Sequence, residues 1–282
     1  MRRLLALMAL MLTPLVTAQT FTFTAIPDQD ETRLRSRFDQ VADYLSAELG
    51  VEVKYVPVKS YAAAITAFRN NQVQLAWFGG LSGVQARARV PGSQAIAQGY
   101  EDQFFKSYFI AHTSTGLTAA ERLPETLRGN TFTFGSKGST SGRLMPEFYL
   151  RQAFEQAPSK TFSKVGFSGD HSRTIALVQA GSYQVGAVNY KVWESELAAG
   201  HIDTSKVQII WETPTYPDYH WTIRGDVDAT WGDDFTAKVT QALLQMKQPA
   251  LLNAFPRSHF VPADNDDYQP ILDTAKSIGL MD

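Results

Sequence analysis

Residues 135–142 read Gly-Ser-Lys-Gly-Ser-Thr-Ser-Gly, between a β-prone segment, 131–134, and a helical pattern that begins at Arg143. Three consecutive hydroxyls, Ser139, Thr140 and Ser141, therefore meet the N-terminus of a helix. Unpaired N–H groups and partial positive charge make such termini favourable for anions, and glycine lets a ligand approach the backbone. An ordinary Ser/Thr N-cap is the simpler interpretation of the stretch. A binding site for a small anion is the more specific hypothesis.

Two related motifs do not fit this stretch. A Walker loop requires Lys after the second glycine, whereas Lys137 precedes Gly138. A nucleophile elbow requires Ser at the centre of its five residues, where Thr140 stands between Gly138 and Gly142. An anion that is held, and not transformed, remains the better expectation.

Strands and helices alternate on both sides of the stretch. A helix over 32–49 is indicated because Leu34, Phe38, Val41 and Leu45 recur at helical spacing. Further helices are expected over 61–68, 81–89, 143–155, 171–180, 191–198, 234–247 and 268–278. Strands are expected over 21–25, 51–58, 73–78, 94–98, 107–112, 130–134, 164–167, 183–188 and 207–211, with 221–224 extended. This alternation predicts mostly parallel sheets with helices on both faces.

The pattern starts again near residue 130, which predicts two α/β lobes joined by a hinge of two crossing strands. Extended connections near 112–116 and 213–221 are the candidate hinge strands. The expected lobes are therefore 19–112 together with 221–282, and 113–220. Ligands bind at the carboxyl ends of strands in such sheets, and between lobes.

Residues 1–18 have the pattern of a secretory signal peptide. Arg2 and Arg3 precede an apolar stretch, 4–12, and Val16-Thr17-Ala18 offers small residues for cleavage after Ala18. The apolar stretch is too short for a stable membrane anchor. The chain has no Cys for a lipid anchor or a disulfide. We expect a soluble periplasmic protein, without membrane insertion.

Composition restricts the partners. Removal of residues 1–18 changes the net charge from −2 to −4, because two of the 26 basic residues leave and all 28 acidic ones stay. Since no basic tract exists, nucleic acid is not an expected partner. The five His lack metal-ligand spacing. Neither a metal nor a cofactor is expected.

Further candidates lie where other expected strands and helices meet. His171 opens a helix after Ser168-Gly169-Asp170 and could donate to an anion; a surface His beside a cap is the alternative. Tyr61 could offer its phenol, or be a core aromatic. Phe78 could wall the pocket and Gly79 could offer a backbone N–H, although a buried aromatic and a turn are the simpler interpretation of each.

Asp218 lies in a Pro-rich connection, where a turn residue is the simpler interpretation. A carboxylate in an anion pocket becomes sensible if the anion carries a proton that it can accept. Asp28 and Asp30 are interpreted as capping and loop residues.

Together these residues resemble the periplasmic binding proteins of phosphonate and phosphite ABC importers, a type II solute-binding family. The most specific part is Ser139 to Gly142 with Pro146 four residues later. The other matching pieces are Ser60-Tyr61, Ala76 to Gly79, His171, Gly186 to Asn189, and Pro217-Asp218. The resemblance implies oxyanion coordination by Ser139, Thr140, Ser141 and His171, with Tyr61 and Asp218 on the walls.

Two departures bear on the ligand. Phe78 stands where the family has Tyr, so one hydroxyl is lost. Tyr190-Lys191-Val192 lacks the acidic residue of aminophosphonate binders, which argues against aminoethylphosphonate. The stretch 78–83, with 98–117, resembles a subgroup named for selenate. Selenate conflicts with Asp218 as an acceptor, so selenate and a protonated anion such as phosphite, phosphonate or phosphate both stay open.

Three functions remain. The leading one is a substrate-binding protein, expected to be a monomer, that closes on a small oxyanion and delivers it to an ABC permease. The second is a periplasmic sensor that docks on a histidine kinase. The third is an enzyme with Ser139, His171 and Asp218 as a triad. We expect no enzyme, because three adjacent hydroxyls suit binding better than one activated nucleophile.

Overall fold

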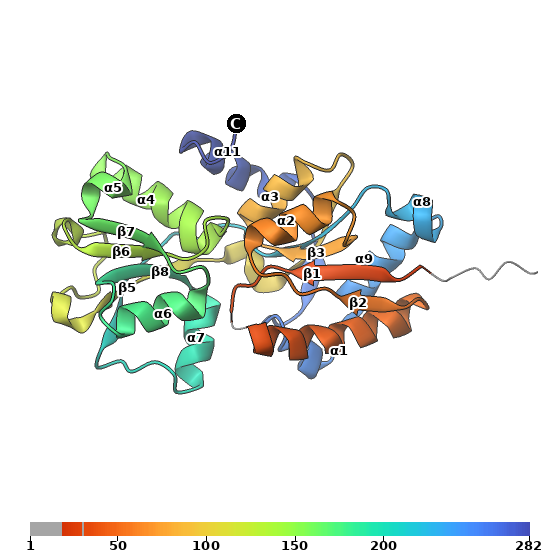
Figure 1. Cartoon of the computed structure of the whole chain (residues 1–282), viewed down its shortest axis with the longest axis horizontal. Helices are drawn as coiled ribbons and strands as arrows, with labels where there is room; N and C mark the ends of the chain where they lie inside the picture. Colours follow the sequence, from red (N-terminus) through yellow and green to blue (C-terminus); the bar gives the residue numbers. More distant parts are fainter. Residues whose placement is uncertain (1–18, 30) are drawn as a thin grey trace, which may run out of the picture.

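The computed structural model describes residues 19–29 and 31–282, which form two lobes, each built on its own β-sheet (Figure 1). The first sheet has six strands in the order β11-β4-β10-β3-β1-β2. The second has five, in the order β7-β6-β8-β5-β9. Helices cover the sheets in both lobes, which confirms the expected two-lobed α/β fold.

Both ends of the described chain belong to the first lobe. Its elements are β1 (Phe21–Ala25), α1 (Glu31–Leu49), β2 (Val53–Tyr55), α2 (Tyr61–Arg69), β3 (Leu75–Phe78), α3 (Gly80–Arg87), β4 (Gln94–Gly99), η1 (Tyr100–Phe104), β10 (His220–Ile223), α8 (Val227–Trp231), α9 (Phe235–Gln245), α10 (Pro249–Leu252), β11 (Phe260–Pro262), η5 (Asp266–Tyr268) and α11 (Gln269–Ser277).

The second lobe is formed by the middle of the chain. Its elements are β5 (Ser107–His112), η2 (Thr113–Thr115), η3 (Glu125–Leu127), β6 (Thr131–Phe134), η4 (Thr140–Leu144), α4 (Met145–Phe154), α5 (Pro158–Thr161), β7 (Lys164–Phe167), α6 (His171–Gln179), β8 (Val185–Asn189), α7 (Tyr190–Ala198) and β9 (Val207–Glu212).

The sheets are mixed, whereas mostly parallel sheets were expected. β1, β2 and β3 are parallel, as are β6, β7 and β8. β10 runs antiparallel to both of its neighbours in the first sheet, and β5 does so in the second. Each of these two strands enters its sheet directly from the other lobe, without the crossover helix that makes neighbouring strands parallel.

The lobe boundary differs from the expected one at β5. We expected residues 107–112 in the first lobe and a crossing at 112–116, but β5 pairs with β8 and β9 in the second sheet. Residues 113–115 form a 3₁₀ turn that ends at left-handed Gly116, so the chain turns there within the second lobe. A bridge between Phe105 and Tyr216 brings together the two connections between the sheets.

The helices follow the sequence pattern. Leu34, Phe38, Val41 and Leu45 of α1 are all buried, as their spacing predicts. The helix expected over 143–155 instead begins at Thr140 with a π-helical turn, in which the N–H of Leu144 donates to the carbonyl of Ser139 at 3.0 Å. Turns of this kind are frequent at functional sites.

One apolar cluster extends across both lobes. It includes Trp77 of the first lobe and Tyr190 of the second. It also includes Phe105 and Tyr219, which lie in the two connections between the sheets. The ring of Phe105 contacts that of Tyr190 with centroids 4.8 Å apart and that of Tyr219 at 5.3 Å. None of the helices formed by the described residues combines the length and apolar character needed to cross a membrane.

Candidate functional site

Helix N-termini from both lobes meet between the two sheets. Tyr61 begins α2 after the N-cap Ser60, and His171 begins α6 after the N-cap Asp170. The π-helical turn η4 and the start of α3 at Gly80 lie at the same junction, since the N–H of Leu81 donates to Thr140 Oγ1 at 3.0 Å. The arrangement brings several helix starts, with their partial positive charge, to one place.

The predicted side chains are buried at this junction. Tyr61, Ser139, Thr140, Ser141, His171 and Asp218 are each at most 2% exposed. Among the described residues, four of their polar atoms are buried without a hydrogen-bond partner: Tyr61 Oη, Ser141 Oγ, His171 Nε2 and Asp218 Oδ2. Buried polar groups are normally satisfied, so this concentration indicates a ligand site.

His171 is a neutral donor. Burial lowers the pKa of its imidazole to about 3. The backbone N–H of Asn189 donates to Nδ1 at 3.3 Å, so Nδ1 carries a lone pair and the proton is assigned to Nε2. The side chain therefore presents one N–H to the site without a positive charge.

Tyr61 is a second neutral donor. Burial, and then the charges of Asp28 and Asp218, raise the pKa of its phenol well above the usual value. The nearby hydroxyls of Ser139 and Tyr219 offset part of this rise, although neither meets Tyr61 Oη in hydrogen-bond geometry. The phenol keeps its proton at all physiological pH values.

The three consecutive hydroxyls have different surroundings. Ser139 Oγ accepts the N–H of Gly142 at 2.9 Å and so caps the turn. Thr140 Oγ1 accepts the N–H of Leu81 from the other lobe. Ser141 Oγ has no partner among the described residues. The N-cap interpretation is therefore right for Ser139, while Ser141 is the hydroxyl most clearly directed to the site.

Asp218 combines a satisfied and an unsatisfied oxygen. Oδ1 accepts the N–H of Gly80 at 2.8 Å, while Oδ2 has no partner within the described chain. Burial raises the pKa of this carboxyl to about 7, against the lowering effect of hydrogen bonds from the Thr140 hydroxyl and the Gly80 N–H. A proton on Asp218, or on a ligand beside it, is therefore accessible near neutral pH.

Gly79 and Phe78 contribute differently from our expectation. The N–H of Gly79 donates to Ser82 Oγ at 3.0 Å. A Cβ on Gly79 would lie 3.0 Å from Asp218 Oδ1 and 3.3 Å from Thr140 Oγ1, so the glycine permits their close approach. The ring of Phe78 packs edge-on against Phe68 in the first-lobe core, with centroids 5.7 Å apart.

Comparison with known proteins identifies the family. Residues 23–268 match the family model described as "ABC transporter, phosphonate, periplasmic substrate-binding protein". The chain belongs to this family. A probable ABC transporter phosphite binding protein, PhnD1 of Prochlorococcus marinus, is 41% identical over 261 residues, which cover 90% of this chain and 88% of that protein.

Solved structures agree with this assignment. The structure of PhnD1 from P. marinus in complex with methylphosphonate aligns with a TM-score of 0.88 and 40% identity, covering 93% of this chain and 99% of that one. A binding protein component of an ABC phosphonate transporter from Pseudomonas aeruginosa aligns with a TM-score of 0.79 at 21% identity, over 90% and 85% of the two chains. The type II fold expected from the sequence is thereby confirmed.

The family is one of transport proteins and not of enzymes, which agrees with our expectation. The triad alternative also fails on geometry, because His171 Nδ1 accepts from the Asn189 backbone and does not donate to Asp218. The comparisons give no support to the selenate subgroup or to the sensor alternative.

Sequence reasoning missed a buried group beside the site of this binding protein. Asp28, interpreted as a loop residue, is 9% exposed and accepts the hydroxyl of Tyr219 at 2.9 Å. Its backbone carbonyl accepts the N–H of His171 from the other lobe at 3.0 Å. The position of Tyr219 next to Asp218 was the available signal. Asp30 lies outside the described residues.

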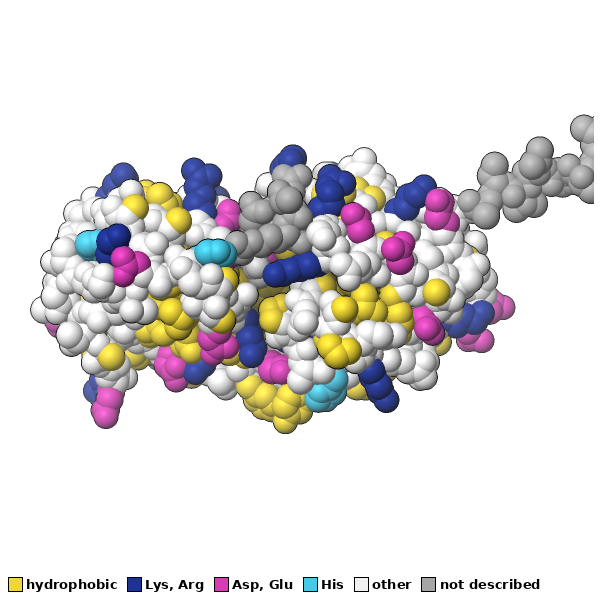
Figure 2. All heavy atoms as spheres, turned by 90° about the horizontal axis from the view of Figure 1, so that it is seen from below, with side chains coloured by type: hydrophobic (Ala, Val, Ile, Leu, Met, Phe, Trp, Pro, Cys, Tyr) yellow, Lys and Arg dark blue, Asp and Glu magenta, His cyan; other side chains and the backbone are white. Residues whose placement is uncertain are grey.

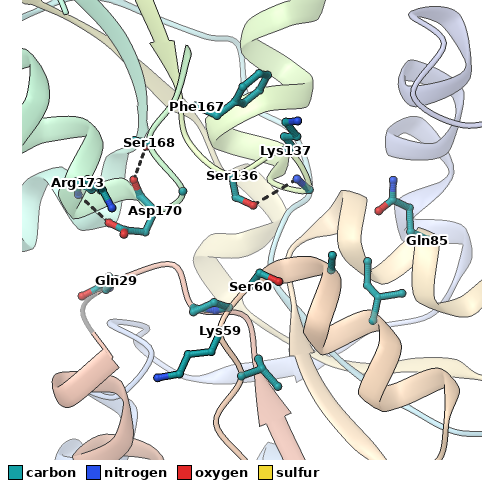
Figure 3. A pocket seen from close by; sticks show the side chains of 16 residues that line it. Gln29, Lys59, Ser60, Gln85, Ser136, Lys137, Phe167, Ser168, Asp170 and Arg173 are labelled. Atoms are coloured by element: carbon teal, nitrogen blue, oxygen red, sulfur yellow. Dashed lines mark hydrogen bonds between the residues drawn. The ribbon is translucent and has the colours of Figure 1, made fainter. Parts of the chain in front are cut away.

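An open groove of about 730 Å³ lies outside the buried atoms, between the lobes. Figure 3 shows Lys59 and Ser60 on one side of it and Lys137 and Arg173 on the other. Figure 2 shows Lys and Arg side chains along the waist between the lobes. A Cβ on Gly138 would lie 3.2 Å from Tyr61 Cβ, so this glycine packs on Tyr61 between the groove and the site.

Proposed function

We propose that this substrate-binding protein captures a singly protonated phosphite or small phosphonate between its lobes and delivers it to an ABC permease. The observation that carries the proposal is the buried Asp218 Oδ2, which has no partner among the described residues and lies at a site that otherwise offers donors. A monoprotonated anion supplies both several acceptor oxygens and the one O–H that this carboxylate requires.

The donor set supports the same ligand class. Tyr61 Oη, Ser141 Oγ and His171 Nε2 each have a hydrogen available and no partner among the described residues. All three are neutral, and Asp218 adds an acceptor. An oxyanion that brings its own proton is compatible with this set. Selenate and sulfate are unprotonated at neutral pH and are repelled by Asp218 whenever its carboxyl is ionised.

The relatives point in the same direction. The name of PhnD1 specifies phosphite, and its solved structure contains methylphosphonate. The identity of 41% extends over nearly the whole chain, so we infer the same ligand class here. The eight residues predicted from the sequence stay our proposed site: Tyr61, Phe78, Gly79, Ser139, Thr140, Ser141, His171 and Asp218. Phe78 and Gly79 contribute to it by packing, since the N–H of Gly79 donates to Ser82 Oγ.

We propose lobe limits close to the sheets, with residues 19–104 and 220–282 in one lobe and 107–212 in the other. Binding and closure then follow from hinge motion at 105–106 and 213–219. Both lobes of one chain supply the site, which supports action as a monomer. Residues 1–18 lie outside the described part of the chain, and we propose that they are a cleaved signal peptide.

Titration calorimetry tests the ligand. We expect phosphite and methylphosphonate to bind more tightly than phosphate, sulfate, selenate and 2-aminoethylphosphonate at one pH and ionic strength. Tighter binding of selenate or sulfate than of phosphite would refute the proposal, and so would the absence of binding by every anion tested.

A further inference from the structure

Four residues, His171 among them, form a closed circuit of backbone and side-chain hydrogen bonds. The backbone N–H of His171 donates to the carbonyl of Asp28 at 3.0 Å. Asp28 Oδ2 accepts the hydroxyl of Tyr219 at 2.9 Å, and Tyr219 Oη accepts Asn189 Nδ2 at 3.0 Å. The backbone N–H of Asn189 then donates to His171 Nδ1 at 3.3 Å, which completes the circuit.

The circuit joins three parts of the molecule. Asp28 lies in the loop between β1 and α1 of the first lobe, and Tyr219 lies in the return connection just before β10. Asn189 ends β8, and His171 begins α6, both in the second lobe. The circuit therefore requires the two lobes to be together, because the His171 N–H that donates to Asp28 belongs to the second lobe.

The direction of each hydrogen bond is determined. Asn189 Oδ1 accepts the N–H groups of Lys191 and Val192 at 2.8 and 3.2 Å, so its amide nitrogen must face Tyr219. Tyr219 accepts from that nitrogen and so directs its own proton to Asp28. The last donor in the circuit leaves Nδ1 of His171 as an acceptor, which places the imidazole proton on Nε2.

We propose that Asp28, Tyr219 and Asn189 are positioning residues that hold His171, at the start of α6, against the first lobe when the cleft is closed. This inference rests on the proposed function, in which His171 Nε2 donates to the ligand. The three residues are 9%, 2% and 2% exposed, so water does not compete effectively for their hydrogen bonds. Opening the cleft thereby breaks the hydrogen bond from His171 to Asp28, so the circuit slows release of the ligand.

The titration behaviour of the circuit is consistent with this role. Burial raises the pKa of Asp28 to about 6, while the hydrogen bond from Tyr219 and the charge of Arg257 lower it, so the carboxylate is available as an acceptor at neutral pH. The pKa of His171, lowered to about 3 by burial, keeps the imidazole neutral throughout.

The decisive variant is Tyr219→Phe, which removes one hydroxyl and retains the ring. Tyr268→Phe is the matched control, because Tyr268 is equally buried and its hydroxyl donates to Gln98 Oε1 at 3.1 Å, outside the circuit. Dissociation of methylphosphonate can be followed by stopped-flow tryptophan fluorescence, since Trp77 stacks on Tyr219 with centroids 5.7 Å apart. The tautomer of His171 is read from its imidazole ¹⁵N shifts.

We expect Tyr219→Phe to dissociate methylphosphonate about fivefold to tenfold faster, with association changed by less than about twofold, as for loss of one hydrogen bond. Its His171 spectrum should keep the Nε2–H form, because the backbone N–H of Asn189 still donates to Nδ1, and Tyr268→Phe should keep native rates. Asn189→Asp is the second variant, because it retains the cap on α7 and removes the donor to Tyr219; we expect the same acceleration.

Native dissociation rates in both circuit variants would overturn the inference, while the ligand assignment would stand. A loss of thermal stability alone, with unchanged dissociation rates, would also overturn it, because that result describes a purely structural role. If the native protein binds neither methylphosphonate nor phosphite, it is the proposed function that fails.

Discussion

The backbone N–H of Leu81 in the first lobe donates to the hydroxyl of Thr140 in the second, at 3.0 Å. The same hydroxyl lowers the pKa of Asp218, whose carboxylate is held by the N–H of Gly80 at 2.8 Å. One threonine thus connects the two lobes and the carboxylate that we propose as the acceptor for the ligand.

Replacement of Thr140 should weaken anion binding through this connection. We expect Thr140→Val, which keeps the shape and removes the hydroxyl, to raise the Kd for methylphosphonate about tenfold, since about 1.4 kcal/mol is a factor of ten. Thr140→Ser retains the hydroxyl and should stay within about threefold of native. Calorimetry on both variants checks the order, and equal affinities for all three proteins would contradict it.

Asp218→Asn should change affinity in opposite directions for two anions. For phosphite the variant loses the acceptor of the ligand proton, so we expect weaker binding. For selenate the variant removes a like charge, so binding should improve or stay the same. Calorimetry at one pH and salt concentration reads both signs, and a selenate affinity that falls in the variant would contradict the acceptor role.

The pH dependence of unfolding should reveal the buried Asp218 carboxyl in the protein without ligand. Its pKa is raised to about 7, mainly by burial, from 3.8. Its contribution to stability is therefore present below about pH 4 and lost as the pH rises through about 7. Native protein should lose up to about 4 kcal/mol relative to Asp218→Asn over this range.

Urea unfolding of both proteins at several pH values measures the difference. Asp28 and Asp102 also have raised pKa values but are common to both proteins, so their effects cancel. A difference that is constant from pH 4 to pH 8 would show that Asp218 is ionised as readily in the folded protein as in the unfolded chain.

Two glycine variants should distinguish the packing of Gly138 on Tyr61 from the close contacts of Gly79 within the anion site. We expect Gly138→Ala to raise the Kd only severalfold, because its Cβ meets Tyr61 Cβ at 3.2 Å and small shifts relieve the contact. Gly79→Ala should raise the Kd further, because its Cβ would lie 3.0 Å from Asp218 Oδ1 and would also press on Thr140 Oγ1. Calorimetry with phosphite gives the order, and the reverse order would place the site elsewhere.

Lobe closure should be visible in solution scattering. Saturating phosphite should lower the radius of gyration, because hinge motion at 105–106 and 213–219 brings the lobes together. The same measurement with selenate at equal concentration is the control for ionic effects. An unchanged radius at saturation would count against closure.

Much of the fold followed from local patterns. The buried face of α1 and the caps of α2 and α6 were readable because helical spacing and Ser or Asp caps are local signals. The sheet to which β5 belongs was not readable, because pairing partners distant in the chain decide it. The π-helical turn at 140–144 was not predicted, because no local pattern marks such a turn as clearly as helical spacing or an N-cap marks a helix.

The site was partly predictable for the same reason. Ser141 and His171 lie at helix starts, and a polar side chain at a predicted helix start is a signal that the local sequence carries. Tyr219 and Asp28 are distant in sequence, and only the folded chain brings the phenol to the carboxylate. The short elements α5, α8, α10 and β11 were missed because three to five residues carry too little periodicity.

The apolar cluster extends through both lobes, with Phe105 between Tyr190 and Tyr219, and we expect it to affect the heat of binding. A phosphite ion has almost no apolar surface, so its own transfer contributes little to a heat capacity change. If opening the cleft hydrates these rings, closure gives a negative heat capacity change that belongs to the protein. The temperature slope of the binding enthalpy then measures how far the free molecule stands open.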